Sequence, residues 1–248
     1  MQRYFLPNDH FTNGYVKMDD ESTKHIARVM RMKNDDEVIC CNEDGSCYIV
    51  ALDVAPDEVR GRVLYQEERS SELPVDVTIA QGLPKGDKLE LTIQKATELG
   101  AFSFLPFEAT RSVAKLDAKK ADKKVERWQR IAKEASEQSH RQRVPNVTFV
   151  SWQELLTSAS DFTHVIVAYE EAAKEDERSS FKAVLQKLSP GDRVLLVCGP
   201  EGGLTDAEVK KLEEVKAIRC GLGPRILRSE TAPLYGLSAI SYQIELSG

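Results

Sequence analysis

The chain has 248 residues, of which 41% are hydrophobic, and a formal net charge of −6 at pH 7. That content suffices for a sizeable core in one large domain or two smaller ones. No apolar run is long enough to span a bilayer, and the first ten residues lack the apolar stretch of a secretory signal. We therefore expect a cytoplasmic protein without a membrane partner. Five cysteines, an odd number without metal-site spacing, favour reduced thiols and no bound metal.

The N-terminal part is predicted to be mostly β. Residues 37–41 and 47–52 are short apolar strands that flank a polar turn, residues 42–45, which ends in glycine. Residues 22–32 have the pattern of a helix with Ser22 as its N-cap. Together these features predict a small β-rich domain.

A polar run that ends in proline, residues 66–74, predicts the boundary between a domain at 1–72 and a second at 73–248. Beyond it, apolar strands alternate with amphipathic helices, which is typical of a parallel sheet flanked by helices. The expected strands are 75–80, 102–107, 163–169, 194–198 and 218–222, and the expected helices are 87–99, 116–140, 176–188, one from Thr205, and 231–246.

The basic segment 111–143 is a plausible footprint for an RNA backbone, because it holds 11 basic and 5 acidic residues. The alternative is a solvated helix, since Val125, Trp128, Ala132 and Ala135 form an apolar stripe at helical spacing. Charge alone favours the solvated helix.

Two strand-to-helix loops near the C-terminus are the most informative segments. Glycines 199, 202 and 203 follow the strand 194–198, and residues 205–208 fit a capping box that opens a helix. The second unit repeats this plan from Ile218 to Arg228. A single such loop indicates an ordinary turn, but two loops at strand ends predict a site for a small ligand.

The spacing of the glycines excludes three common ligand sites. The third glycine of a dinucleotide fingerprint is missing after Gly223, and neither a phosphate-binding P-loop nor a nucleophile elbow occurs. The residues alone therefore predict a polar small molecule held by backbone groups.

Residues 198–205 and 222–232 resemble the signature segments of the SPOUT methyltransferases, which bind S-adenosylmethionine in a trefoil knot. The resemblance is strongest to the RsmE family, the bacterial 16S ribosomal RNA uridine-N3 methyltransferases. Other segments that resemble this family are 81–88 with Lys95 and 98–100, 111–113, 137–138 with Arg141 and Pro145, 3–5, and 25–31. The resemblance implies a PUA-like β-barrel domain followed by a knotted α/β methyltransferase domain that forms a homodimer.

The expected reaction is methylation of N3 of a uridine in small-subunit ribosomal RNA, free or in the 30S subunit, with S-adenosyl-L-methionine as the donor. Arg225 and Arg228 are expected to stabilise the negative charge that develops on uracil, and Glu201 or Glu230 to accept the proton. As alternatives, each carboxylate could stabilise the start of a helix, and the arginines could be its partners.

The resemblance also implies which residues bind the donor and the RNA. The donor site is expected to include Leu196, Gly199, Pro200, Glu201, Gly202, Gly203, Ile218, Leu222, Gly223, Ile226, Leu227 and Arg228. The expected phosphate contacts are Arg3, Arg28, Arg31, Lys85, Lys88 and Arg111. His25 and His140 are isolated, so we expect structural or RNA-facing roles rather than metal binding.

The last helix, residues 231–246, carries apolar residues on two faces, with Leu237 and Ile240 on one and Tyr235 and Tyr242 on the other. A fully buried helix and a helix at a subunit interface both fit this pattern, and the resemblance favours the interface.

Two other functions are compatible with the sequence. One is a SPOUT enzyme that methylates a ribose 2′-oxygen or another base. The other is a ribosome-assembly factor that binds RNA without catalysis. Two glycine loops with both arginines count against a factor without a donor site.

Overall fold

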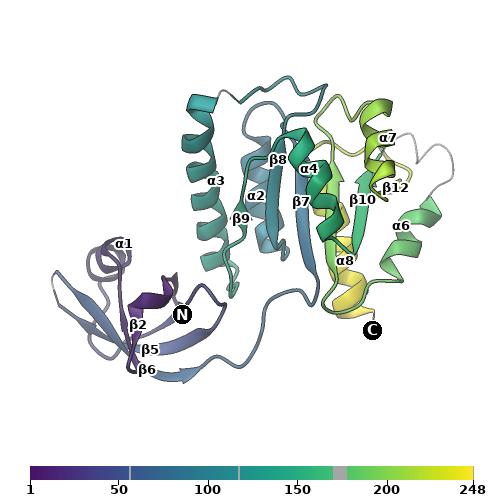
Figure 1. Cartoon of the computed structure of the whole chain (residues 1–248). Helices are drawn as coiled ribbons and strands as arrows, with labels where there is room; N and C mark the ends of the chain where they lie inside the picture. Colours follow the sequence, from purple (N-terminus) through teal and green to yellow (C-terminus); the bar gives the residue numbers. More distant parts are fainter. Residues whose placement is uncertain (56, 117, 170–177, 248) are drawn as a thin grey trace. The chain divides into compact units, whose positions relative to one another are not determined.

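The computed structural model describes residues 1–55, 57–116, 118–169 and 178–247 (Figure 1). These residues divide into two compact units. The first comprises Met1–Glu72 with Ser136–Val144, and the second comprises Leu73–Ala135 with Pro145–Gly248. The predicted boundary divides the chain once, at residues 72 and 73. In the structure the chain also returns to the first unit at Ser136–Val144. Arg141 of this segment is buried, and its guanidinium is hydrogen-bonded to Glu72.

The first unit contains a six-stranded sheet in the order β1-β4-β5-β6-β3-β2. Strand β1 pairs in parallel with β4, and the other neighbours are antiparallel. The strands are β1 (Arg3–Phe5), β2 (Phe11–Thr12), β3 (Tyr15–Lys17), β4 (Glu37–Cys41), β5 (Cys47–Val54) and β6 (Val59–Gln66). The predicted hairpin between β4 and β5 is confirmed.

The predicted helix of this unit is shorter and is capped by a different residue. Helix α1 spans Asp20–Lys24 and continues as a π-helical turn, His25–Met30. The carboxylate of Asp19 accepts a hydrogen bond from the Ser22 backbone N–H at 2.7 Å, so Asp19 is the N-cap. The prediction of Ser22 as the cap is wrong, because Ser22 already lies inside the helix with its side chain buried.

Two of the five cysteines form a disulfide, which corrects the prediction that all are reduced. Cys41 and Cys47 are directly opposite each other in the β4–β5 hairpin, with a Cα–Cα distance of 4.0 Å, and their sulfur atoms are bonded. Cys40, Cys198 and Cys220 are free and buried. The pairing was missed because the predicted turn brings the two residues opposite each other only once the strand register is known.

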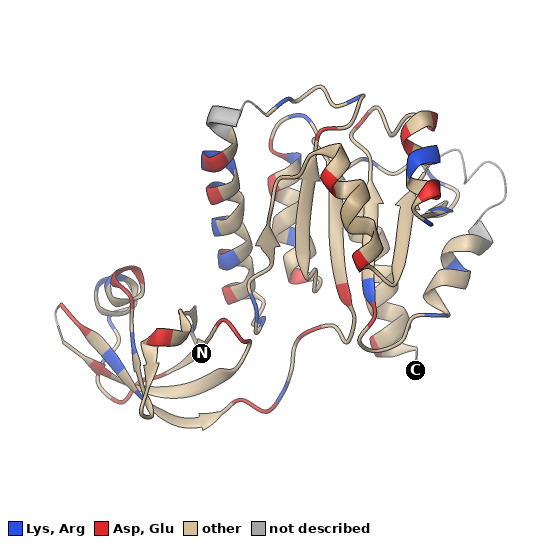
Figure 2. Cartoon of the chain, viewed as in Figure 1, with Lys and Arg blue, Asp and Glu red and all other residues tan. Residues whose placement is uncertain are grey.

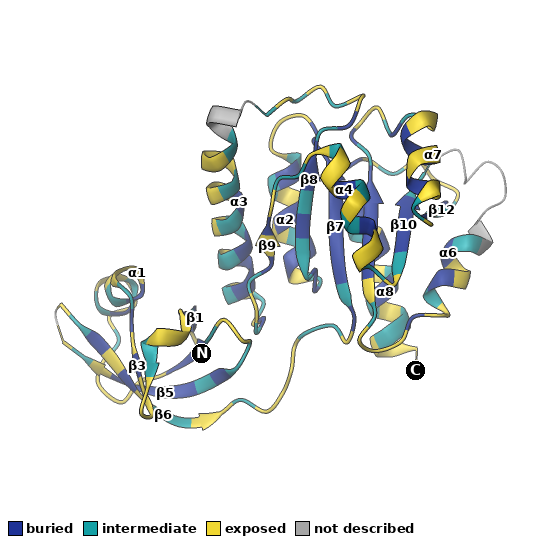
Figure 3. Cartoon of the chain, in the orientation of Figure 1, coloured by how far each residue is buried: buried dark blue, intermediate teal, exposed yellow. Residues whose placement is uncertain are grey.

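The second unit contains a parallel six-stranded sheet in the order β12-β10-β11-β7-β8-β9. Its strands are β7 (Asp76–Gly82), β8 (Ser103–Phe107), β9 (Asn146–Val147), β10 (His164–Ala168), β11 (Arg193–Cys198) and β12 (Ile218–Cys220). The central strands are almost wholly buried (Figure 3), as expected for a sheet covered on both faces.

Helices cover both faces of this sheet. They are α2 (Lys88–Glu98), α3 (Ala118–Gln138), α4 (Trp152–Ser158), α6 (Arg178–Leu185), α7 (Asp206–Glu214) and α8 (Thr231–Ser241), which continues as a π-helical turn, Tyr242–Leu246. Short 3₁₀ turns occur at Asn8–His10 and Ala159–Asp161. On one face, Leu195 and Val197 of β11 belong to the same core cluster as residues of α4 and α7. On the other, Leu196 meets Gly236 of α8 so closely that a Cβ there would lie 2.7 Å from its Cδ2.

The long helix α3 has the apolar stripe predicted for it. Trp128, Ala132 and Ala135 are buried, while lysines and arginines alternate with acidic residues along the rest of the helix (Figure 2).

The predicted fold class, a small β-rich domain followed by a parallel α/β domain, is confirmed. The trefoil knot implied by the resemblance stays a prediction. In the part of the chain that the structure describes, no helix combines the length and apolar character needed to cross a membrane.

Candidate functional site

The carboxyl ends of three adjacent parallel strands, β10, β11 and β12, open into one groove of about 1070 Å³ in the second unit. Both glycine loops line it, as expected for ligand sites in parallel sheets. The predicted donor-site residues that line the groove are Gly199, Pro200, Glu201, Gly202, Gly203, Leu222, Gly223, Ile226, Leu227 and Arg228. Leu196 and Ile218 do not line it: Leu196 packs under α8, and Ile218 is 39% exposed on β12.

The first loop, Gly199–Gly203, is folded tightly on itself. Gly203 has a φ of +68° and donates its backbone N–H to the Pro200 carbonyl at 2.8 Å. A Cβ on Gly199 would lie 2.9 Å from the backbone of Gly203 and Leu204, so no larger residue fits without a backbone shift. These two positions therefore require glycine, as the sequence indicates.

Neighbouring segments hold this loop in place. The Gln81 side-chain amide at the end of β7 donates to the Gly199 carbonyl at 3.0 Å, and Arg111 donates to the Gly202 carbonyl at 3.0 Å. The predicted capping box is confirmed: the Thr205 hydroxyl accepts from the Glu208 N–H, and the Glu208 carboxylate accepts from the Thr205 N–H. The first loop is thus a preorganised wall of the groove.

Both predicted proton acceptors contact one lysine. Lys88 Nζ lies 2.8 Å from Glu201 Oε1 and 3.5 Å from Glu230 Oε2. Glu201 also accepts a hydrogen bond from the Lys85 backbone N–H at 3.0 Å. Glu201 and Lys88 line the groove, whereas Glu230 does not. The structure therefore places both carboxylates around one lysine, but only Glu201 is accessible from the groove.

The ionisation of this cluster follows from its contacts. Desolvation would raise the pKa of Glu201, but hydrogen bonds from Lys88 and from backbone N–H groups, with the charge of Lys88, outweigh it and lower the pKa. For Glu230, desolvation is likewise outweighed by its own backbone N–H, the Ser229 hydroxyl and Lys88, so its pKa is also lowered. The hydrogen bond to Glu201 is the main reason that the pKa of Lys88 is raised. All three groups are therefore charged at neutral pH.

The second loop presents its cations without such partners. Arg225 and Arg228 are exposed and line the groove, and neither forms an ion pair with any residue that the structure describes. The alternative role of the arginines as partners for Glu201 and Glu230 is thus wrong, because Lys88 takes that place. The neighbouring Ile226 is 76% exposed. This side of the groove is open and positively charged.

The predicted phosphate contacts are in different environments. Arg28, Arg31 and Lys85 are exposed, and Lys88 and Arg111 line the groove. Arg3 is 3% exposed and bonded through Nη2 to both Glu67 oxygens, at 3.0 and 2.9 Å. The prediction that Arg3 contacts phosphate is therefore wrong, because its charge is neutralised inside the first unit.

Sequence reasoning missed the part of the groove formed by β10. Ala168 and Tyr169 line it, and the Tyr169 hydroxyl donates to Asp206 Oδ1 at 2.7 Å. The available signal was their position at the carboxyl end of a predicted parallel strand. The sequence did not show that this strand lies next to β11 in the sheet. Cys198 also lines the groove, and burial raises the pKa of its thiol to about 12, so it is a neutral apolar group there.

The two histidines singled out in the sequence lie apart from the groove lining. His25 Nδ1 lies 3.0 Å from the Tyr4 hydroxyl, and His140 is exposed on a backbone with a φ of +57°. Among the described residues, no group of three or more histidine, cysteine, aspartate or glutamate side chains is placed to hold a metal ion.

Comparison with known proteins gives two family matches. A model described as an RNA methyltransferase domain matches residues 71–241, and one described as an RNA methyltransferase PUA domain matches residues 18–54.

Several relatives match over nearly the whole chain. Ribosomal RNA small subunit methyltransferase E of Bacillus subtilis (strain 168) is 52% identical, covering 99% of this chain and 98% of the relative. The protein of that name from Mycobacterium bovis is 33% identical, covering 92% and 87%. A crystal structure of the Neisseria gonorrhoeae methyltransferase E bound to S-adenosyl methionine has a TM-score of 0.81 and 27% identity, covering 97% of each chain. The chain therefore belongs to the RNA methyltransferase family that includes ribosomal RNA small subunit methyltransferase E.

Proposed function

We propose that this protein is an S-adenosylmethionine-dependent methyltransferase that modifies N3 of one uridine in small-subunit (16S) ribosomal RNA. Its relatives support ribosomal RNA as substrate and S-adenosylmethionine as donor. The observation that carries the proposal is the groove itself. It joins, at the ends of adjacent strands, a tight glycine loop, a charged carboxylate and two arginines that form no ion pair with a described residue.

The groove suits the proposed donor in size and lining. Its backbone approaches closely at Gly199, where any side chain would clash, and Leu222 and Leu227 supply apolar surface for a purine. Gly199–Gly203 and Leu222–Arg228 would hold the donor. When bound, the donor supplies a methyl group on a positively charged sulfur. The proposed role of the chain is to orient the uracil nitrogen toward that methyl group.

The two arginines of the second loop are proposed to stabilise the uracil. Loss of the N3 proton puts negative charge on the ring oxygens, and cations placed there in advance lower the barrier. Arg225 and Arg228 suit this role because no carboxylate among the described residues already neutralises them.

Glu201 is the better of the two proton acceptors. It lines the groove and is ionised, so it can accept a proton directly or through water. Glu230 does not line the groove and, through its contact with Lys88, acts as a positioning residue.

The first unit is proposed to bind RNA through its exposed cations. Arg28 and Arg31 lie at the end of the π-helical turn, beside the exposed side chains of Val29 and Met30. Guanidinium groups next to apolar surface suit phosphates and unstacked bases. In the second unit, the proposed contacts are Lys85, three residues before α2, and Lys88 and Arg111, which line the groove.

A homodimer is proposed from the exposed face of the last helix. Leu237 and Ile240 of α8 are fully buried, but Tyr235 is 40%, Tyr242 62% and Leu246 73% exposed. Two tyrosines and a leucine on one helical segment are the residues expected at a subunit interface. Light scattering on the purified protein should give a mass near twice 27.8 kDa. The cytoplasm, where ribosomes assemble, is the proposed location.

The decisive experiment is methylation of 30S subunits from a strain that lacks this protein. Purified enzyme and labelled donor should transfer one methyl group per subunit, and nucleoside mapping should recover 3-methyluridine.

A 2′-O-methylated nucleoside or another methylated base would contradict the N3 assignment and keep the enzyme class. Donor binding by calorimetry without transfer to subunits or to free 16S RNA would contradict the proposed substrate. Absence of donor binding would favour an assembly factor.

A further inference from the structure

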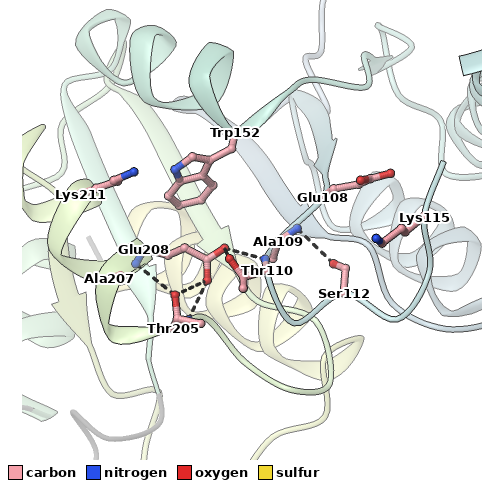
Figure 4. A pocket seen from close by; sticks show the side chains of 10 residues that line it. All are labelled: Glu108, Ala109, Thr110, Ser112, Lys115, Trp152, Thr205, Ala207, Glu208 and Lys211. Carbon is pink, nitrogen blue, oxygen red and sulfur yellow. Dashed lines mark hydrogen bonds between the residues drawn. The ribbon is translucent and has the colours of Figure 1, made fainter. Parts of the chain in front are cut away.

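A second cavity, of about 390 Å³, lies in the second unit and has no role in the reaction described above (Figure 4). It is lined by the segment after β8, by Trp152 at the start of α4 and by the first turns of α7. Figure 4 shows the Trp152 indole with Lys211 on one side and Glu108 and Lys115 on the other.

This cavity shares a wall with the groove. In the segment after β8, Thr110 and Ser112 line the cavity, while Arg111 between them lines the groove. In α7, Lys211 lines the cavity and its neighbour Lys210 lines the groove. Residues adjacent in sequence thus line the cavity and the groove in turn, so the two lie on either side of the same segments.

The aromatic surface of the cavity is rigidly held. Trp152 is half-buried and packs against Phe107, with a centroid distance of 5.6 Å and an interplanar angle of 45°. A capping box between Ser151 and Glu154 fixes the start of α4 beside it. An indole that is held on one side by the core and faces a cavity on the other suits stacking of a flat base.

The cavity holds two lysines that can contact a phosphate group. Lys115 and Lys211 are exposed, and neither forms an ion pair with a described residue. Of the two carboxylates, Glu208 is buried and accepts hydrogen bonds from the N–H and hydroxyl groups of Thr110 and Thr205. Glu108 Oε1 accepts from the Leu116 N–H at 2.6 Å. The lysines are therefore available for a ligand, whereas the carboxylates already have donors.

We propose that this cavity binds a nucleotide of the substrate RNA close to the methylated uridine, with its base on Trp152 and its flanking phosphates at Lys115 and Lys211. This inference rests on the proposed function. A free nucleotide has the same chemistry, and the experiment below distinguishes the two sources.

The test measures the affinity for 30S subunits that lack the modification, at several salt concentrations, for K115A/K211A, W152L and W152F. The double lysine variant should bind subunits about tenfold or more weakly. The slope of its log binding constant against log salt concentration should be smaller in magnitude by about 0.7 for each phosphate contact that is lost. Trp152→Leu should weaken binding by about fivefold or more, and Trp152→Phe, which keeps a flat ring, should restore most of it. Donor affinity should not change in any variant.

The matched control is Lys182→Ala, which removes an exposed helical lysine that lines neither cavity. Thermal melting identifies any variant that is misfolded. If the Trp152 variants do not fold, the double lysine variant still tests the proposal. Unchanged subunit binding by the lysine variants, with wild-type methylation intact, would overturn this inference and leave the proposed function standing. Quenching of tryptophan fluorescence by uridine monophosphate, lost in the variants while subunit binding is unchanged, would overturn the RNA assignment in favour of a free nucleotide.

Discussion

The two loops that line the groove are built in opposite ways. Gly199–Gly203 is tied to Gln81, Arg111 and Lys88 by hydrogen bonds, and its backbone is packed too closely at Gly199 for any side chain. The second loop, from Leu222 to Arg228, instead exposes Ile226 and two arginines without carboxylate partners among the described residues.

From this difference we infer that the two loops have different roles, one in binding the donor and one in binding the substrate. A wall that is ordered before binding loses little entropy when it holds a ligand, so it suits the donor, which is the same in every turnover. Cations that are free in the absence of RNA retain their full charge for the substrate. Four predictions test this division, from the largest expected effect to the smallest.

Replacing the carboxylate of the first loop, Gly199–Gly203, which is called the fixed loop below, should have the largest effect on the reaction. Glu201→Gln keeps the size of the side chain but removes the proton acceptor, so the rate of methyl transfer should fall by about 10² to 10⁴-fold. Glu230→Gln, which does not line the groove, should cost about tenfold or less. Single-turnover methylation of 30S subunits measures both. Equal losses in the two variants would assign the chemistry to the Lys88 cluster as a whole.

The arginines of the open loop should affect turnover and not donor binding. Arg225→Ala and Arg228→Ala should each lower kcat by about 10² to 10³-fold, because each removes a charge placed for the transition state. The donor Kd, measured by calorimetry, should stay within about twofold. Loss of donor binding in either variant would show that the second loop holds the donor through that guanidinium as well as through its backbone and its leucines.

Adding a methyl group to the fixed loop should weaken donor binding according to what that methyl group meets. Gly199→Ala places a Cβ 2.9 Å from backbone atoms, which must then shift, so donor affinity should fall by about 100-fold. Gly202→Ala places its Cβ 3.0 Å from Arg111 Cβ, a milder overlap that a small shift of the Arg111 segment relieves, so the loss should be about tenfold or less. Calorimetric titration compares them. Similar losses would mean that the first loop is less rigid than its contacts indicate.

The anchor of the fixed loop should show itself in the pH dependence of stability. Desolvation would raise the pKa of Glu208, but hydrogen bonds from Thr110 and Thr205 outweigh it and lower the pKa below its ordinary value of 4.5. A carboxylate whose pKa is lowered by folding stabilises the protein above its unfolded pKa, and this contribution is lost as the pH falls through the folded value.

Glu208→Gln should therefore lower the free energy of unfolding by about 1–3 kcal/mol at pH 7, and by less as the pH falls below 4.5. Denaturant melts at both pH values measure the difference, with Glu214→Gln on the exposed side of α7 as the control. A difference that does not depend on pH would assign the effect to packing.

Much of this architecture could be predicted from local sequence patterns. The capping box at Thr205 and Glu208, the β4–β5 hairpin and the tight loop at Gly199 each depend on residues within a few positions of one another. Their backbone conformation and hydrogen bonds are decided locally, so spacing and residue type suffice. The same reasoning mistook Ser22 for the cap, because several residues that can cap a helix, Asp19 and Ser22 among them, stand at the start of this one.

Long-range pairing decided the rest. The family resemblance implied that Arg3 contacts phosphate, but Arg3 is buried and Glu67, 64 positions away, neutralises its charge. Lys88 is hydrogen-bonded to Glu201, 113 positions away in the sequence. The proposed proton acceptor and the lysine that holds it therefore come from distant segments. Such contacts depend on strand order and register.

The sequence by itself therefore determined the kind of site, two glycine loops at strand ends with their charged residues, because turn chemistry is local. Only the tertiary structure decided which charges remain free for a ligand. It also placed Trp152 and two lysines around a cavity that shares a wall with the groove. The physical reason is that an ionic group acts according to its partners and burial, and both are set by segments that meet only in the folded chain.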